Sequence, residues 1–168
     1  MRKSLLFVFS AILAAALITG CAGLGKSAAP KRAPDFKVKL MDKSEVTLDS
    51  FKGRPLVLNF GSSRCPRCIF EFPAFKEVYD SRKGDAEFLM IFLKSSEDEV
   101  VSLVNKNDSK FKVAMDPDGV SGDAYNVFGI PVTFFIDENG NIVDDYFGSI
   151  SKRELNNRID ELTKKAGK

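Results

Sequence analysis

The sequence predicts an α/β fold in which a central mixed β-sheet is flanked by helices. From Phe36 onward, strand-like and helix-like segments alternate along the chain, and the last two strand-like segments form a hairpin followed by a terminal helix. A strand-helix-strand succession is typical of parallel pairing, whereas a hairpin is antiparallel. The sheet is therefore expected to contain both kinds of pairing.

The first strands form a β-hairpin at the start of the folded part. Residues 36–40 alternate polar and apolar side chains with a period of two, and residues 45–48 repeat this pattern after a turn at 41–44. This hairpin is an N-terminal extension of the fold. The following apolar run, residues 55–60, is typical of a strand buried in the centre of a sheet.

A helix and a second buried strand follow the central strand. The helix is expected from about residue 65 to 81, broken or bent at Pro73, because proline removes a helical hydrogen bond. The second buried strand covers residues 87–93. Ser96 then precedes three acidic residues that favour a helix N-terminus, which predicts a helix to about Asn105.

The last third of the chain contains a short strand, a hairpin and a helix. The strand is expected at residues 112–115, and residues 132–136 and 142–147 flank Asn139-Gly140, a dipeptide typical of hairpin turns. The terminal helix is capped by Ser151 and places its apolar side chains on one face, namely Leu155, Ile159 and Leu162.

The composition excludes several classes of function. With 25 Lys and Arg against 23 Asp and Glu, the 168-residue chain has a net charge of only +2, so no nucleic-acid partner is expected. The chain contains no histidine, which excludes a Ser-His-Asp triad, a Cys-His pair and imidazole metal ligands. Its three cysteines are Cys21, Cys65 and Cys68, and a zinc site at the close pair would lack two further ligands. We therefore expect no metal.

Residues 1–20 are typical of a lipoprotein signal peptide. Two basic residues precede the apolar run 5–18, which is too short to span a bilayer comfortably. The run ends in residues 17–21, which resemble the bacterial lipobox: an aliphatic residue three before the cysteine, then small residues. This resemblance implies that Cys21 is acylated and becomes the new N-terminus. The alternative is an ordinary secreted protein that is cleaved nearby and keeps a free thiol.

The lipobox predicts a membrane-anchored protein outside the cytoplasm. Residues 21–32 are rich in Ala, Gly and Lys and are expected to form the lipidated N-terminus and a flexible linker, which leaves residues 33–168 as the folded domain. Two or more acyl chains give lasting attachment. The location is then the periplasmic or outer-surface face of a membrane, where disulfides persist and a cysteine pair is a candidate for redox work.

Cys65 and Cys68 stand where the central strand has ended and a helix begins. Free backbone N–H groups and the helix dipole at this position stabilise a thiolate and lower the pKa of Cys65, which makes Cys65 the attacking sulfur. Cys68, one turn deeper, is the resolving sulfur and forms a redox disulfide with Cys65. Arg64 and Arg67 either lower the pKa of Cys65 further or are solvated surface cations. A purely structural disulfide is the other interpretation, although so small a ring removes little chain entropy.

Five short motifs are shared with a known family. They are Ala33-Pro34-Asp35-Phe36, residues 53–60, the cysteine pair with Glu71 and Pro73 after it, residues 129–133, and Ile136-Asp137 before Gly140. Through them the chain, from Ala33 to about Leu162, resembles the TlpA/ResA-like branch of the thioredoxin superfamily, which is related to the AhpC/TSA proteins. The resemblance implies a thioredoxin-like fold.

The resemblance also assigns roles to three further residues. It implies that Pro131 is cis and lies against the cysteine pair, and that the backbone of Ile130 binds the partner chain. It implies that Glu71 influences the thiol pKa values and accepts a proton, although a bare helix glutamate is more often a surface residue. Asn59 stands where cytoplasmic thioredoxins carry a buried Asp and is unable to accept a proton, which leaves Glu71 or water for that role.

The function that the resemblance implies is reduction of protein disulfides, with cytochrome c apoproteins as the best-known substrate class of the family and antioxidant activity as a related role. Electrons would come from a membrane partner, and no cofactor is expected. The chain departs from the family in its lead-in, residues 61–64, which lacks the aromatic Trp-x-x-Trp pattern before Cys65. The alternatives are a thiol peroxidase, a deiodinase-like reductase, which residues 54–62 resemble, and a docking lipoprotein whose disulfide is inert.

Overall fold

The structure, a computed structural model, describes residues 31–166 and contains an eight-stranded sheet. Its strands are β1 (Lys31–Arg32), β2 (Lys37–Leu40), β3 (Glu45–Thr47), β4 (Leu56–Gly61), β5 (Glu87–Leu93), β6 (Lys112–Asp116), β7 (Val132–Ile136) and β8 (Asn141–Phe147). They lie in the order β1-β8-β7-β4-β5-β6-β2-β3. Because β4 pairs in parallel with β5 and antiparallel with β7, the predicted mixed sheet is confirmed.

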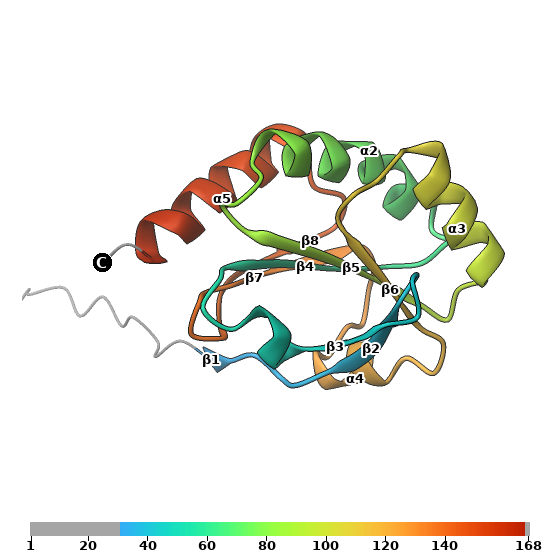
Figure 1. Cartoon of the computed structure of the whole chain (residues 1–168), viewed down its shortest axis with the longest axis horizontal. Helices are drawn as coiled ribbons and strands as arrows, with labels where there is room; N and C mark the ends of the chain where they lie inside the picture. The colour runs from blue at the N-terminus through green and yellow to red at the C-terminus, as the bar shows by residue number, and fades with distance from the viewer. Residues whose placement is uncertain (1–30, 167–168) are drawn as a thin grey trace, which may run out of the picture.

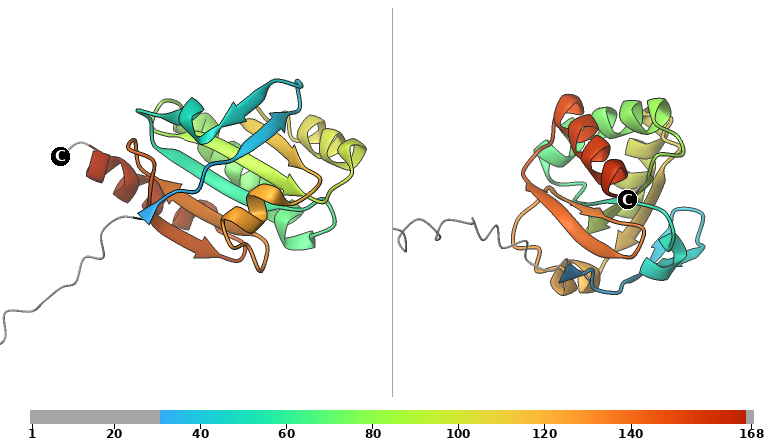
Figure 2. Two further views of the ribbon diagram at one scale, coloured as in Figure 1. Left: turned by 90° about the horizontal axis from the view of Figure 1, so that it is seen from below. Right: turned by 90° about the vertical axis from the view of Figure 1, so that its left-hand side faces the viewer.

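Helices cover both faces of the sheet (Figure 1, Figure 2). One face carries α2 (Pro66–Ser81), α3 (Glu97–Lys106) and α5 (Lys152–Ala166). The other face carries the 3-10 helix η1 (Leu48–Phe51) and α4 (Val120–Ala124). The hydrophobic core accordingly has two parts, one under the three long helices and one on the opposite face.

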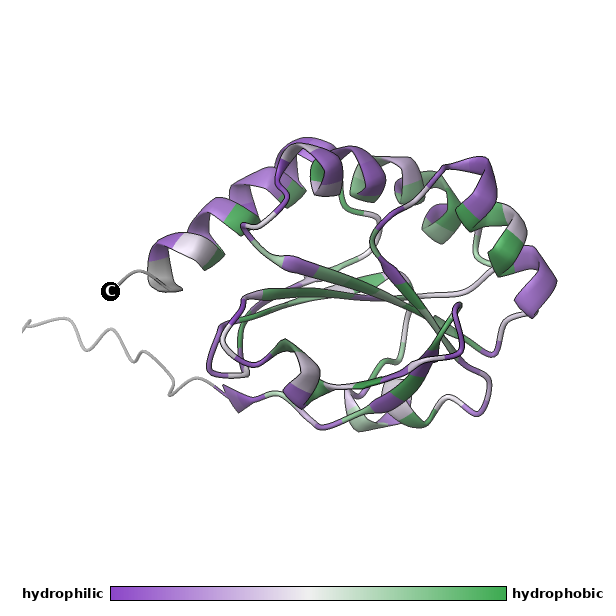
Figure 3. Ribbon diagram, viewed as in Figure 1, coloured by the Kyte–Doolittle hydropathy of each residue, from purple (hydrophilic) through white to green (hydrophobic). Residues whose placement is uncertain are grey.

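The central strand β4 is buried along its whole length. Leu56, Leu58 and Phe60 belong to the core beside α4, whereas Val57 packs with Phe72 of α2 in the core of the opposite face. Burial on both faces explains why this strand has a continuous apolar run. Figure 3 shows the same distribution, with apolar residues along the central strands and hydrophilic residues on the outer surfaces of the helices.

The N-terminal hairpin extends the sheet at one edge. Strands β2 and β3 pair antiparallel, and β2 also pairs antiparallel with β6 through Lys39–Leu40. At the other edge, Lys31 and Arg32 pair with the start of β8 as strand β1, although the sequence places them in the flexible linker. Arg32 is held there because its guanidinium donates to the carbonyl of Asn139 at 2.8 Å. The sheet thus includes two residues that precede the predicted domain boundary.

Two helical features differ from the prediction. Helix α2 runs through Pro73 without a break, because Pro73 lies on the exposed side of the helix while Phe72 and Phe75 hold the other side in the core. The short helix α4 was not predicted, since five residues are too few to show a helical period. The buried carboxylate of Asp116 stabilises α4 by accepting hydrogen bonds from the backbone N–H groups of Gly119 and Ser121, at 2.9 and 2.8 Å.

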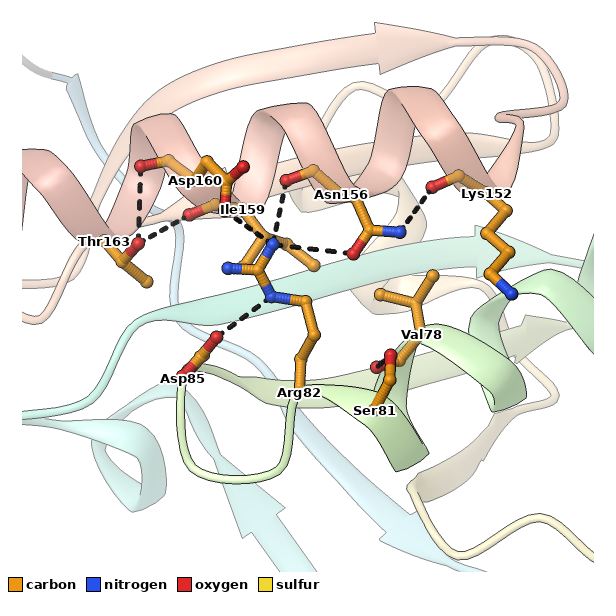
Figure 4. Close-up of polar contacts among 9 residues, drawn as sticks. All are labelled: Val78, Ser81, Arg82, Asp85, Lys152, Asn156, Ile159, Asp160 and Thr163. Atoms are coloured by element: carbon orange, nitrogen blue, oxygen red, sulfur yellow. Dashed lines mark hydrogen bonds and ion pairs between the residues drawn. The ribbon is translucent and has the colours of Figure 1, made fainter.

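An arginine fastens the C-terminal end of α2 to α5 (Figure 4). The Arg82 guanidinium forms an ion pair with Asp160 of α5 at 2.6 Å and donates to the carbonyl of Asn156 at 3.2 Å. It also pairs with Asp85 at 2.9 Å. Because α2 begins at the cysteine pair, this contact fixes the far end of the helix that carries the candidate site.

The predicted signal peptide, residues 1–20, and the lipidation site Cys21 lie outside the described residues. So does the predicted linker, apart from Lys31 and Arg32. Among the helices described, none has the length and apolar character needed to cross a membrane.

Substitution of two phenylalanines of α2 tests which face of that helix is buried in the core. Phe75 is 1% exposed, and its ring lies 6.3 Å from that of Phe88, measured between centroids. We expect Phe75→Ala to lower the free energy of unfolding by about 3–5 kcal/mol, as large-to-small core substitutions do. In Phe70→Ala, the matched control with an 83% exposed ring, the change should stay within about 0.5 kcal/mol. Urea unfolding measures both, and equal losses would contradict the orientation of α2.

Candidate functional site

Cys65 lies at the N-terminus of α2, as predicted. It is the N-cap residue with extended backbone, and Pro66 occupies the first helical position. The Cys65 Sγ accepts a hydrogen bond from the backbone N–H of Cys68 at 3.2 Å and is joined to the Cys68 sulfur in a disulfide. The Cys65 sulfur therefore occupies the place where free N–H groups at a helix end stabilise a thiolate.

The two sulfurs differ in their access to solvent. Cys65 is partly exposed, whereas Cys68 is 1% exposed. Cys68 packs against the last residue of β4, because a Cβ added at Gly61 would lie 3.3 Å from its Cβ and 3.5 Å from its Sγ. Glycine at position 61 leaves the space that the inner sulfur fills. Cys65 is thus the more accessible of the two residues, and its role as the attacking sulfur stays a prediction.

The segment before Cys65 is held by polar contacts with the neighbouring strand and helix. The backbone N–H of Ser63 donates to the Ser95 hydroxyl at 2.9 Å, and the Ser63 hydroxyl donates to Glu99 of α3 at 2.6 Å. Sequence reasoning did not identify Ser95 or Glu99. A signal existed, because the parallel strands β4 and β5 end at the same edge of the sheet and Ser95 follows β5.

Glu71 is buried behind the cysteine pair. It follows Cys68 by three residues on α2, so both side chains lie on the same face of the helix, and it is 2% exposed. Its Oε1 accepts from the Asn59 side-chain amide at 3.0 Å, and its Oε2 accepts from the backbone N–H of Ile150 at 2.9 Å. Burial raises the pKa of Glu71 to about 7, against the opposing effect of these hydrogen bonds.

Asn59 connects Glu71 with β7. Its side-chain N–H group also donates to the Thr133 hydroxyl at 3.0 Å, while its carbonyl oxygen is buried without a hydrogen-bond partner. Thr133 and Ile150 were not predicted as site residues. Thr133 belongs to one of the sequence motifs and could have been found there, but Ile150 contributes a backbone N–H group that no residue type reveals.

Ile130 and Pro131 lie at the same end of the sheet. Val132 pairs with Phe60, so Pro131 stands beside the end of β4 from which the chain leads to Cys65. The Ile130–Pro131 bond is cis, as predicted. The Pro131 carbonyl accepts from the N–H of Gly148 at 2.8 Å, which joins this loop to the end of β8.

Two arginines stand close to Cys65 in the sequence. Arg64 and Arg67 are exposed, and within residues 31–166 neither forms an ion pair. The described part of the chain also contains no group of three His, Cys, Asp or Glu side chains placed to hold a metal ion. The chemistry that this arrangement supports is thiol–disulfide exchange at Cys65 with proton transfer close to Cys68.

Comparisons with known proteins agree with this geometry. The model of the AhpC/TSA family matches residues 30–145. The thiol-disulfide oxidoreductase ResA of Bacillus thuringiensis subsp. konkukian is 30% identical over 134 residues, which cover 79% of this chain and 78% of the relative.

Two solved structures are similar along most of their length. A protein described as the thiol:disulfide interchange protein DsbE of Chlorobium tepidum has a TM-score of 0.73 and 26% identity, covering 80% of this chain and 96% of that one. The exposed lipoprotein thioredoxin of Streptococcus pneumoniae has a TM-score of 0.67 and 26% identity, covering 76% of this chain and 99% of that one. The predicted thioredoxin-like fold is therefore confirmed.

The raised pKa of Glu71 predicts how stability depends on pH. Because the folded protein holds this proton up to about pH 7 while the unfolded chain releases it near pH 4.5, stability should fall as the pH rises between these values, by about 3 kcal/mol. Glu71→Gln should lack this decline. Glu77→Gln, at an exposed position on the same helix, should retain it. Urea unfolding of the disulfide form at pH 5 and pH 8 measures the difference, and an unchanged decline in Glu71→Gln would refute the assignment.

Proposed function

Since the chain belongs to the AhpC/TSA family, we propose that it works as a lipid-anchored reductase of protein disulfides on the outer side of a membrane. It is an enzyme of the thiol–disulfide oxidoreductase class. The observation that carries the proposal is the Cys65–Cys68 disulfide at the start of α2, with one sulfur accessible and the other buried. The reductive direction is what the family resemblance implies.

The reaction begins with the reduced protein. The Cys65 thiolate attacks one sulfur of the substrate disulfide, so that a mixed disulfide forms and the other substrate sulfur leaves as a thiolate. Cys68 then loses its proton and attacks the Cys65 sulfur, which releases the second substrate sulfur and leaves Cys65–Cys68 oxidised. Two electrons pass to the substrate. A membrane donor of dithiol type reverses these steps and restores the reduced pair.

Glu71 is the acceptor that we propose for the Cys68 proton. Both side chains are buried on one face of α2, and with a pKa of about 7 the carboxyl group exchanges a proton readily at neutral pH. Asn59 lies next to Glu71 but has no titratable group. Glu71 thereby supplies the function that the buried Asp provides in cytoplasmic thioredoxins.

We assign the docking of the substrate backbone to Ile130 and Pro131. Their loop ends beside β4, close to the segment that leads to Cys65, and Ile130 is only partly buried. An extended substrate segment would pair with the Ile130 backbone while its disulfide faces Cys65. The substrate class is protein disulfides, with apoproteins of cytochrome c as candidates from the family resemblance.

The membrane anchor rests on the lipobox that ends at Cys21 and on the similarity to an exposed lipoprotein of Streptococcus pneumoniae. In this proposal the signal peptide is removed, Cys21 is acylated, and residues 22–30 link it to strand β1. The anchor would keep the enzyme close to its electron donor in the membrane.

Single cysteine substitutions test the assignment of the two sulfurs. Cys68→Ser should attack once and accumulate mixed disulfides with its partners, because nothing resolves the bond to Cys65. Cys65→Ser should trap none and should abolish exchange. Non-reducing gels of cells that produce each variant show the trapped species, and Cys21→Ser is the matched control with the redox pair intact. Equal trapping by the two variants would mean that the nucleophile is misassigned.

Two further measurements distinguish the proposed reductase from a thiol peroxidase and from a docking lipoprotein. Catalytic consumption of peroxide by the reduced enzyme at a rate above that of disulfide exchange would favour a thiol peroxidase. A Cys65–Cys68 bond that dithiothreitol fails to reduce in the folded protein would favour the docking lipoprotein.

Lipidation has its own test. Intact-mass analysis of the membrane fraction should show a mature chain that starts at Cys21 with added acyl chains. Cys21→Ser should release the protein from the membrane while exchange activity persists, because the redox pair lies in the folded domain. An unmodified Cys21, or a mature chain that starts elsewhere, would refute the anchor.

A further inference from the structure

Three phenylalanine side chains are exposed to solvent, although most phenylalanines of the domain are buried. Phe70 is 83% exposed, Phe128 is 95% exposed and Phe147 is 70% exposed. A single exposed apolar residue needs no explanation, whereas a group of them on one face marks an interaction site. Their position relative to Cys65 therefore matters.

All three belong to segments that meet near the cysteine pair, at the carboxyl end of β4. Phe147 is the last residue of β8 and pairs with Val132, the neighbour of Pro131. Phe128 precedes Pro131 by three residues on the same loop, a span of at most about 11 Å. Phe128 thus lies on the loop that stands beside the end of β4, and Phe147 lies opposite the residue that follows this loop.

Phe70 lies on α2 and forms the third part of this exposed aromatic surface. Together with Pro66, Arg67 and Ser149 it lines an open hollow of about 640 Å³, and two of these residues stand between the cysteines in the sequence. Ser149 follows Phe147 by two residues, so the hollow connects the helix with the end of β8. We call Phe70, Phe128 and Phe147 the aromatic rim.

The charges at the rim are positive. Arg64 and Arg67 flank Cys65 and are exposed, and no carboxylate of the described residues pairs with either of them. Glu99, the carboxylate that approaches the lead-in segment, is bound to the Ser63 hydroxyl. A ligand with a carboxylate next to its reacting sulfur would therefore find unpaired guanidinium groups, which bind carboxylates in a bidentate manner.

We propose that the aromatic rim and the two arginines select extended polypeptide segments in which apolar side chains and a carboxylate flank the reacting cysteine. This inference rests on the proposed function and names its substrate class more closely. The apolar side chains would cover the rim, the hollow beside Phe70 would take one of them, and the carboxylate would pair with Arg64 or Arg67. Such a segment brings its disulfide to Cys65 before exchange begins.

The position of strand β1 favours a protein over a lipid surface as the ligand of the aromatic rim. Strand β1 pairs with Asn141 and Ile142, the first residues of β8, whereas Phe147 is the last residue of that strand (Figure 1). At about 3.3 Å per residue, the two ends of β8 are roughly 20 Å apart. An anchor that reaches the domain through β1 therefore joins it at the end opposite the rim.

Peptide kinetics test the proposal. Two peptides of equal length would each carry one cysteine in a disulfide with thionitrobenzoate, flanked by Leu and Asp in one peptide and by Ser and Lys in the other. The reduced full-length protein reacts with each peptide and with hydroxyethyl disulfide, and the rates are expressed relative to that small disulfide. We expect the Leu/Asp peptide to be preferred at least about tenfold, as burial of one large apolar side chain with an ion pair implies.

Substitutions in the aromatic rim and at Arg67 test which side chains produce the preference between the two peptides. Phe70→Ser and Phe147→Ser should each lower the relative rate for the Leu/Asp peptide about tenfold, and Arg67→Glu should shift the preference toward the Ser/Lys peptide. Val101→Ser, which replaces an exposed apolar residue of α3 outside the rim, is the control and should retain the preference.

The outcomes separate this inference from the proposed function. Failure to react with hydroxyethyl disulfide and with both peptides would refute the reductase itself. Reaction with all three but no preference between the peptides, or a preference that the rim variants leave unchanged, would overturn the inference alone. If incorporation of the full chain into lipid vesicles blocked peptide exchange and Phe70→Ser relieved the block, the rim would bind lipid, and the inference would again be wrong.

Discussion

Burial of β4 on both faces is the constraint on which the rest of the site depends. The strand is buried along its whole length, through Gly61. At the carboxyl end of this strand the chain leaves the sheet and leads through a short segment into α2. Parallel β5 ends at the same edge and supplies Ser95, and antiparallel β7 starts there after Pro131. Three segments that are distant in the sequence therefore meet around Cys65 because of strand direction alone.

Two opposing effects determine the pKa of the buried Glu71 carboxyl group. Enclosure beneath α2 disfavours its charged form, while the N–H groups of Asn59 and Ile150 favour it. The result is a pKa of about 7, at which either protonation state is accessible. The same burial makes the domain less stable at neutral pH than at acidic pH, because the unfolded chain releases this proton at a lower pH.

The redox site and the proposed point of attachment lie at opposite ends of the sheet. The cysteine pair, the cis-proline loop and the aromatic rim share one end of the sheet, while strand β1 lies at the start of β8 at the other end. Arg82 fixes the far end of α2 to α5, and Ser95 and Glu99 hold the segment that leads into its first turn.

The sequence by itself determined the elements and the redox pair. Periodicity located β4, β5 and α5 within a residue or two, and the position of Cys65 and Cys68 between a buried strand and a helix predicted their order of reaction. These features depend on neighbours along the chain. A break at Pro73, one of the two outcomes predicted there, does not occur, and the continuity of α2 depends on which side of the helix faces the core.

Only the tertiary structure decided the environment of the site. Glu71 accepts hydrogen bonds from Asn59 and from the Ile150 N–H group, and Asn59 in turn donates to Thr133, so three other parts of the chain form its surroundings. The support of the lead-in segment by Ser95 likewise depends on the pairing of β4 with β5. Residue type and spacing indicate which groups are present. The pKa of a buried group depends on desolvation and on partners distant in sequence, which only the packed domain brings together.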